Sequence, residues 1–192
     1  MQLNPKFLSI EEIVSAYGGF GNLKIDLGCG FYKPSGFIGL DNMVGIKSQY
    51  ESDNIPDIFI DLHNEPLPFE DGACAIVRSS HYLEHSNLDF TFQEAFRVLS
   101  EDGIFENIFP YALSDEGMFP GHSIFLTETW FRENVTFQTL FEIQEFHYRK
   151  SKSYENWNRL LKIIIPYRFA RRHLYNVCDE IYLKAKKRKG ND

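Results

Sequence analysis

Residues 23–30 read LKIDLGCG and residues 37–41 read FIGLD. The first segment is short and apolar and ends in Gly28-Cys29-Gly30, so it predicts a buried strand that enters a tight turn. Glycine lets the backbone turn sharply there and approach a ligand closely. The second segment predicts another strand, and the carboxylate of Asp41 at its end can accept both hydroxyls of a ribose. This order is typical of a nucleoside-cofactor site in a doubly wound α/β sheet.

The turn does not suit a dinucleotide. The dinucleotide fingerprint has a third glycine at the position where this chain has Lys33. The connection from Cys29 to Phe37 is too short for the usual crossover helix, whose N-terminus would bind a pyrophosphate. S-adenosylmethionine carries a positive sulfonium and no phosphate, so it does not need that helix.

Further segments follow in a fixed order: Asp61-Leu62, Pro66–Phe69 (PLPF), Ser80–His85 (SHYLEH), Glu94 with Arg97–Leu99 (RVL), and Gly103–Phe105 (GIF). Together with the turn, and over about Leu23 to Phe131, they resemble the class I S-adenosylmethionine-dependent methyltransferases. The resemblance is greatest to the compact bacterial-type branch, in which the second strand follows the cofactor turn almost at once. It implies a Rossmann-like, mainly parallel sheet with a shortened first crossover and an antiparallel last strand beside the fifth.

The function implied is methyl transfer from S-adenosylmethionine, with S-adenosylhomocysteine as product, to a small-molecule or glycan-linked acceptor. The glycan rests only on analogy with the branch. Ala75 replaces a carboxylate common in the fourth strand, and Glu101-Asp102-Gly103 replaces the usual Pro-Gly-Gly. These departures leave a non-catalytic cofactor-binding or scaffold protein as the alternative. An RNA methyltransferase is disfavoured by the acidic chain, and a dinucleotide oxidoreductase ranks third.

The resemblance also implies cofactor contacts. Asp26 would contact the amino group of the methionine moiety, Asp41 the ribose, and Asp61 with the Leu62 N–H the adenine. The alternatives are a capped strand end that holds the glycine turn for Asp26, a strand-end carboxylate facing solvent for Asp41, a turn cap for Asp61 and a space-filling side chain for Cys29. The full predicted set is Asp26, Gly28, Cys29, Gly30, Phe31, Asp41, Asn42, Asp61, Leu62, Ser79 and Ser80.

Three residues are candidates for catalysis. His81 follows the fourth strand, and its ordinary pKa near neutrality suits a general base. Tyr111 and His122 lie in the segment after the fifth strand, about 110–130, where we expect acceptor recognition, with 150–176 as a lid. Glu84 and His85 are expected to support the site residues from behind.

The pattern H-x-x-E-H from His81 also matches a zinc-protease helix, but it begins at a strand end, so no metal is predicted. Positioning alone can supply most of the catalysis.

At 192 residues and 43% hydrophobic content the chain predicts one methyltransferase-like domain, 1–192, with a cofactor half (23–100) and an acceptor or lid half (101–192). Its net charge is −7.

Cys29, Cys74 and Cys178 are odd in number and widely spaced, which favours a reducing cytoplasm. We expect no leader and no membrane span, and interpret 160–166 (LLKIIIP) as a core segment or cap. The basic tail 184–189 is interpreted as the solvated end of the last strand. Nucleic acid is disfavoured as a partner, and the sequence does not determine the oligomeric state.

Periodicity predicts the remaining elements. Ser9 and Glu12 form a capping box for an N-terminal helix over 9–17. Strands are expected near 23–28, 37–41, 57–61, 74–79, 103–109, 137–149 and 179–185. Helices are expected over 88–99, near 127–134 and over most of 155–176.

Overall fold

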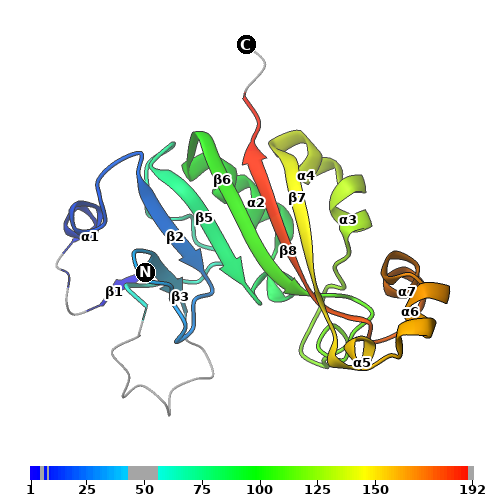
Figure 1. Ribbon diagram of the computed structural model, residues 1–192. Helices are drawn as coiled ribbons and strands as arrows, with labels where there is room; N and C mark the ends of the chain where they lie inside the picture. The colour runs from blue at the N-terminus through cyan, green and yellow to red at the C-terminus, as the bar shows by residue number, and fades with distance from the viewer. Residues whose placement is uncertain (5–6, 8, 43–55, 190–192) are drawn as a thin grey trace.

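The computed structural model describes residues 1–4, 7, 9–42 and 56–189. Its centre is an eight-stranded sheet of order β1-β4-β3-β2-β5-β6-β8-β7 (Figure 1). The strands are β1 (Gln2–Leu3), β2 (Leu23–Leu27), β3 (Ile38–Asp41), β4 (Ile58–Phe59), β5 (Cys74–Ser80), β6 (Leu99–Pro110), β7 (Phe141–Lys150) and β8 (Cys178–Lys187).

Strands β4, β3, β2, β5 and β6 run parallel, and β8 pairs antiparallel with both β6 and β7. The last strand of the chain therefore lies beside the fifth expected strand, which confirms the predicted Rossmann-like arrangement. Residues 28–37 form turns and no helix, which confirms the shortened first crossover. Strand β1, which was not predicted, pairs antiparallel with β4 at the other edge.

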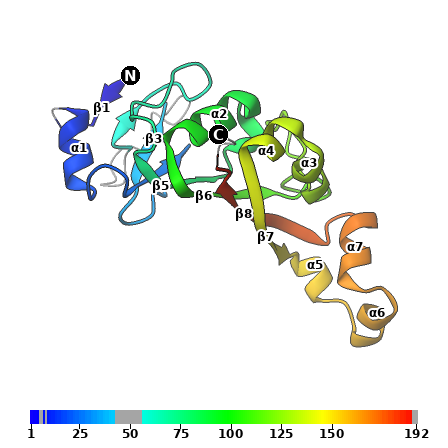
Figure 2. The ribbon, with the colours of Figure 1, turned by 90° about the horizontal axis from the view of Figure 1, so that it is seen from above.

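The helices are α1 (Ile10–Ala16), the 3-10 helix η1 (Leu83–His85), α2 (Leu88–Val98), α3 (Glu128–Glu133), α4 (Val135–Leu140), α5 (Lys152–Glu155), α6 (Arg159–Ile164) and α7 (Tyr167–His173). Ser9 Oγ accepts the Glu12 N–H at the start of α1, as predicted. Figure 2 shows α2, α3 and α4 together on one side of the sheet. Phenylalanine rings fill this layer: the Phe92 ring lies 6.0 Å from Phe105 and 5.1 Å from Phe137.

The opposite face of the β6–β8 region is partly open. Phe105 and Leu183 point to the helices and are fully buried, whereas Glu106 and Lys184 alternate with them and remain partly exposed. Parallel sheets usually have helices on both faces. Here the short β2–β3 connection supplies none, so polar side chains line that face.

Several predicted boundaries are wrong. Residues 137–140 belong to α4, because Asn134 caps a helical turn there by accepting the Phe137 N–H, and the predicted strand begins only at Phe141. The fifth strand begins at Leu99, directly after α2. The helical region 155–176 consists of short separate helices, and Pro166 stands between α6 and α7.

Within the described residues, no helix has the length and apolar character needed to cross a membrane. The three cysteines are buried and unpaired.

Candidate active site

The turn after β2 owes its shape to two glycines in the left-handed region, Gly28 at φ +64° and Gly30 at φ +49°. A Cβ at Gly28 would lie 2.7–2.9 Å from atoms of the Tyr82 side chain, whereas a Cβ at Gly30 would meet nothing within 4 Å. Gly28 is therefore required by packing as well as by conformation. Gly30 borders open space, as a turn that accommodates a ligand must.

Asp41 ends β3 beside this turn. The parallel register of β2 and β3 pairs Leu27 with Leu40, so the next residues of both strands emerge together. The Gly30 N–H donates to Asp41 Oδ2 over 2.9 Å, and the Asp41 carboxylate stays partly exposed. The turn and the predicted ribose carboxylate are thus brought together at one edge of the sheet.

The buried carboxylate of Asp57, which the sequence analysis missed, supports this turn through hydrogen bonds to Lys33 and to the β3 backbone. Asp57 Oδ2 accepts from Gly39 N at 2.8 Å and from Lys33 Nζ at 2.6 Å. The Tyr17 hydroxyl donates to its other oxygen at 3.2 Å. A Cβ at Gly39 would lie 2.7 Å from Cys29 Sγ, which agrees with the space-filling interpretation of Cys29. An acid immediately before a short strand was the only sequence signal for Asp57.

Asp26 lies one residue before the end of β2 and is 2% exposed. Its Oδ1 is 2.6 Å from Arg78 Nη1 on β5. Burial raises the pKa of Asp26 to about 6, although the Arg78 guanidinium opposes the shift. One oxygen of Asp26 thus already has a cationic partner where the sequence analysis expected a ligand ammonium group.

The Asp61-Leu62 segment forms a turn after β4. Asp61 Oδ1 accepts the His63 N–H at 3.0 Å and Oδ2 accepts from Asn64 at 2.9 Å, so the carboxylate caps its own turn. Tyr82 Oη donates to the Leu62 carbonyl at 3.2 Å. The same tyrosine therefore contacts both Gly28 and the predicted adenine loop.

Helix α2 clamps the rest of this loop. Glu94 accepts the Leu67 N–H at 2.7 Å, and Arg97 donates to the carbonyls of Leu67 and Phe69 at 2.8 and 2.7 Å. Arg97 also donates to Glu94. The motif residues Glu94 and Arg97 therefore hold the PLPF segment in place.

The remaining predicted cofactor residues differ in accessibility. Ser79 is fully buried and donates to Asn107 Oδ1 at 2.8 Å, while Ser80 is partly exposed at the end of β5. Phe31 is partly exposed and Asn42 is exposed. The neighbouring Tyr32 is 89% exposed, so its ring does not fill the site.

His81 leaves β5 with a left-handed backbone, φ +54°. Its Nε2 lies 3.0 Å from Glu180 Oε1 and its Nδ1 lies 3.5 Å from Glu84 Oε1. The hydrogen bond to Glu180 and the nearby Glu84 carboxylate raise the pKa of His81 to about 10. In this arrangement the two carboxylates favour the protonated imidazole of His81, which argues against the predicted role of His81 as general base.

Glu84 is the point on which the histidines converge. It is 1% exposed, and His122 Nε2 lies 4.0 Å from its Oε1. The rings of His85 and His122 meet edge to face with centroids 4.8 Å apart. Ligand atoms of Glu84, His85 and His122 lie within 4.8 Å of one another. Neighbouring ligands of tetrahedral zinc are about 3.3 Å apart, so this cluster would have to contract to hold a metal.

Tyr111, the third catalytic candidate, has a buried side chain. It is 3% exposed and packs in the core, with the Arg171 guanidinium 5.7 Å from its ring centre. Burial raises the pKa of its hydroxyl to about 12. The structure therefore brings His81 and His122 together on Glu84 and leaves Tyr111 in a packing position.

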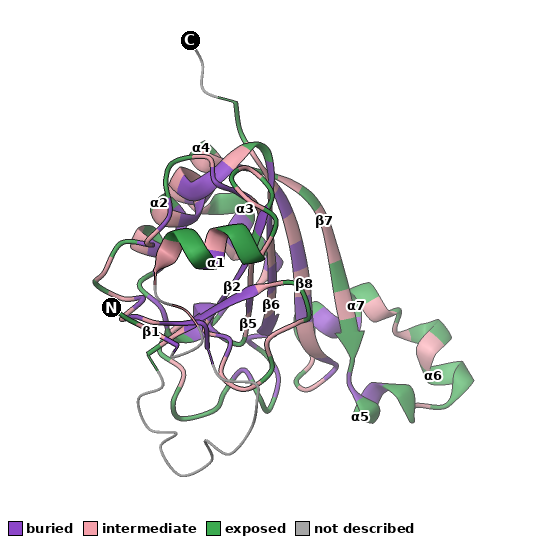
Figure 3. Cartoon of the chain, turned by 90° about the vertical axis from the view of Figure 1, so that its left-hand side faces the viewer, coloured by how far each residue is buried: buried purple, intermediate pink, exposed green. Residues whose placement is uncertain are grey.

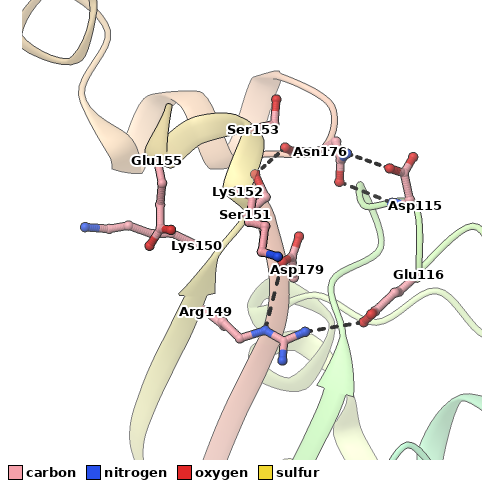
Figure 4. Close-up of a pocket in the computed structure, with 10 residues that line it drawn as sticks. All are labelled: Asp115, Glu116, Arg149, Lys150, Ser151, Lys152, Ser153, Glu155, Asn176 and Asp179. Carbon is pink, nitrogen blue, oxygen red and sulfur yellow. Dashed lines mark hydrogen bonds and ion pairs between the residues drawn. The ribbon is translucent and has the colours of Figure 1, made fainter. Parts of the chain in front are cut away.

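A polar cavity of about 600 Å³ opens between the segment after β6 and the end of β7 (Figure 4). Its lining residues are Asp115, Glu116, Arg149, Lys150, Ser151, Lys152, Ser153, Glu155, Asn176 and Asp179. Arg149 points toward Glu116 and Asp179, at 3.7 and 4.0 Å. Its Nη2 also lies 2.9 Å from Glu180, the partner of His81. Ion pairs therefore connect this cavity to the end of β5.

Comparison with known proteins agrees with this geometry. Residues 25–106 match the family model described as a methyltransferase domain. No curated protein matches the chain.

Solved structures resemble the chain over most of its length. An S-adenosylmethionine-dependent methyltransferase from Archaeoglobus fulgidus has a TM-score of 0.63 and 14% identity, covering 93% of this chain and 91% of that chain. Another from Mesorhizobium loti has a TM-score of 0.51 and 17% identity, with coverages of 87% and 91%. The cyclase SpnF has a TM-score of 0.56 and 16% identity, with coverages of 89% and 76%. At these identities the likeness concerns the fold.

Proposed function

Because residues 25–106 match the methyltransferase-domain family and the fold is that of S-adenosylmethionine-dependent methyltransferases, we propose that the chain methylates a small, hydroxyl-rich acceptor bound in the Arg149 cavity. The observation that carries this proposal is the cavity itself. It lies at the edge of the sheet where parallel strands end, the edge at which doubly wound sheets bind ligands. It is also connected through Glu180 to His81, at the end of the strand expected beside the methyl donor.

The residues at the β2–β4 ends fit the cofactor. Gly30 borders open space, Asp41 stands partly exposed beside it, and Leu62 follows the β4 turn. We propose that the Gly28–Gly30 backbone, Asp41 and the Asp61-Leu62 turn hold the nucleoside, and that Ser80 lies near the sulfonium. When bound, S-adenosylmethionine supplies an electrophilic methyl group.

The chain's own residues would then position the acceptor. His81, whose two ring nitrogens face Glu84 and Glu180, would hold the Glu180 carboxylate in place at the edge of the cavity. His122 lies beside Glu84 with its Nδ1 3.3 Å from the Gly117 carbonyl, an arrangement that orders the segment after β6. Catalysis would rest on positioning and exclusion of water rather than on a strong base.

The cavity lining favours a sugar-like acceptor. Its side chains are carboxylates, cations, hydroxyls and one amide, and all can exchange hydrogen bonds with hydroxyl groups. Phe119 and Phe125 lie in the segment after β6 but outside the cavity lining; they are 61% and 51% exposed and would offer apolar surface only to an acceptor that extends beyond the cavity. This supports the small-molecule or glycan-linked acceptor class, with 101–192 as the acceptor half.

Two measurements test the proposal. Calorimetry of the folded protein with S-adenosylhomocysteine should show binding near one per chain, and its absence would contradict the cofactor assignment. A screen of monosaccharides and glycosides with radiolabelled methyl donor should then identify an acceptor. Arg149→Ala should raise KM for that acceptor without changing S-adenosylhomocysteine affinity. Lys24→Ala, an exposed cation on β2, is the matched control.

A non-methylating protein on the same fold is the second candidate. The Arg78 guanidinium already pairs with Asp26, and SpnF, which has this fold, is named for a cyclisation. Cofactor binding without methyl transfer to any acceptor in the screen would favour this candidate.

A further inference from the structure

Residues 151–177 join β7 to β8 and form an arm that projects from the sheet (Figures 2 and 3). The arm has a small core of its own, in which Tyr154, Ala170 and Val177 are buried. Arg171 attaches α7 to the body: its guanidinium lies 2.7 Å from Glu128 and 3.6 Å from the Tyr148 ring centre. The arm is therefore a folded structure with a defined outer surface.

That outer surface is apolar where a globular protein is normally polar. No residue of α6 is buried, and Leu160, Ile163 and Ile164 are 67%, 67% and 66% exposed. Phe169 of α7 is 55% exposed. The expectation that 160–166 forms a core segment or cap is therefore wrong. Large apolar side chains gathered on one exposed surface mark a site of interaction.

The same arm is basic within an acidic protein. Residues 152–173 carry six Lys or Arg side chains and one carboxylate, Glu155, a formal charge of +5 in a chain of net −7. Lys152, Arg159 and Arg168 are exposed and flank the apolar residues in sequence. An exposed apolar surface bordered by cations is typical of segments that lie in the interface of an anionic membrane.

We propose that the α6–α7 tip of the arm docks onto the surface of an anionic lipid membrane. Leu160, Ile163, Ile164 and Phe169 would enter the headgroup–acyl boundary while Arg159 and Arg168 contact lipid phosphates. With six residues, α6 lies on the membrane and does not cross it.

The observations disfavour two other occupants. A symmetric contact with a second copy would bring two surfaces of the same positive charge together. Nucleic acid would use the cations, but bases stack on aromatic rings, whereas α6 exposes leucine and isoleucine. Of these three occupants, an anionic lipid surface is the one that uses both the aliphatic and the cationic side chains.

The test is flotation of the full chain with phosphatidylcholine vesicles, with and without phosphatidylglycerol. We expect binding to the anionic vesicles that weakens in high salt and with pure phosphatidylcholine. Leu160→Glu with Ile163→Glu should lower the partition coefficient at least about tenfold, since it removes two inserted aliphatic groups. Arg159→Glu with Arg168→Glu should also lower it.

Val135→Glu is the matched control, because Val135 is 78% exposed on α4, outside the arm. All variants should keep the wild-type melting temperature and S-adenosylhomocysteine affinity, which separates this proposal from the proposed function. Equal vesicle binding by the arm variants and the wild type would overturn it. So would wild-type dimers that dissociate in Leu160→Glu with Ile163→Glu without any vesicle binding, or RNA binding that replaces vesicle binding.

Discussion

Gly28 and Gly30 share a left-handed backbone but have different neighbours. An alanine at Gly28 would be strained by the φ of +64° and its methyl group would also clash with the Tyr82 side chain. An alanine at Gly30 would be strained only by the φ of +49°, because no atom lies within 4 Å of the added methyl group. A left-handed non-glycine residue costs about 1–2 kcal/mol, and overpacking adds about 1–3 kcal/mol.

We therefore expect Gly28→Ala to lower the free energy of unfolding by more than Gly30→Ala does. Urea unfolding of both variants measures the difference. Equal losses would mean that Tyr82 moves aside at no cost.

Asp41 is the residue on which cofactor affinity should depend most. Asp41→Ala removes the proposed ribose acceptor and the partner of the Gly30 N–H, so it should weaken S-adenosylhomocysteine binding by about 1–3 kcal/mol. Calorimetry measures the loss, and circular dichroism should show an intact fold. Asp102→Ala, an exposed carboxylate paired with Lys186, serves as control. Unchanged affinity would place the ribose elsewhere.

Asp26 should make stability depend on pH. Its folded pKa of about 6 exceeds the ordinary 3.8, so the folded state holds the proton more tightly than the unfolded chain does. The contribution of Asp26 to the free energy of unfolding is therefore largest below the unfolded pKa and falls, by at most about 3 kcal/mol, as the pH rises through the folded pKa.

Asp26→Asn does not titrate and provides the reference. We expect the free energy of unfolding of the wild type, minus that of Asp26→Asn, to decrease between about pH 4 and pH 6.5. A constant or rising difference would show that Arg78 outweighs burial.

At the scale of elements, α2 both covers the sheet and holds the loop after β4. Arg97→Ala removes charged hydrogen bonds to two loop carbonyls, so it should cost about 1.5–3 kcal/mol of stability. Hydrogen exchange of the Leu67 amide should also accelerate. Arg159→Ala, on the exposed α6, should change neither quantity. A slow Leu67 amide in Arg97→Ala would show that Glu94 alone holds the loop.

At the scale of the whole molecule, the sheet is covered unevenly. Leu183 of β8 is fully buried on the helix side, whereas Tyr182 points to the partly open face. Leu183→Ala should cost about 2–5 kcal/mol and leave a cavity, while Tyr182→Ala should cost clearly less. Denaturant midpoints compare the two variants directly. Similar losses would mean that the second face is covered in solution.

The sequence by itself determined the cofactor turn, the positions of the central strands along the chain and the start of α1, because each depends on neighbouring residues. Glycine permits a left-handed turn, alternation of apolar residues indicates a buried strand, and Ser9 caps the amide three residues later. The short connection from Cys29 to Phe37 likewise excluded a crossover helix, and the preference for a cofactor without a pyrophosphate was inferred from it. The assignments of ribose and adenine contacts stay predictions, as does the cytoplasmic location.

Only the tertiary structure decided which distant charges meet and which apolar side chains stay outside. Arg78 reaches Asp26, and Glu180 joins Arg149 to His81, because strand pairing sets registers between residues far apart in sequence. That pairing places His81 between two carboxylates, which raise its pKa and favour its protonated form. The apolar stretch at 160–166 has the composition of a core segment, but the arm contacts the body through α7 and residues 175–176, so α6 remains exposed. Local patterns report what a segment can form, whereas burial and charge depend on partners that only the folded chain brings together.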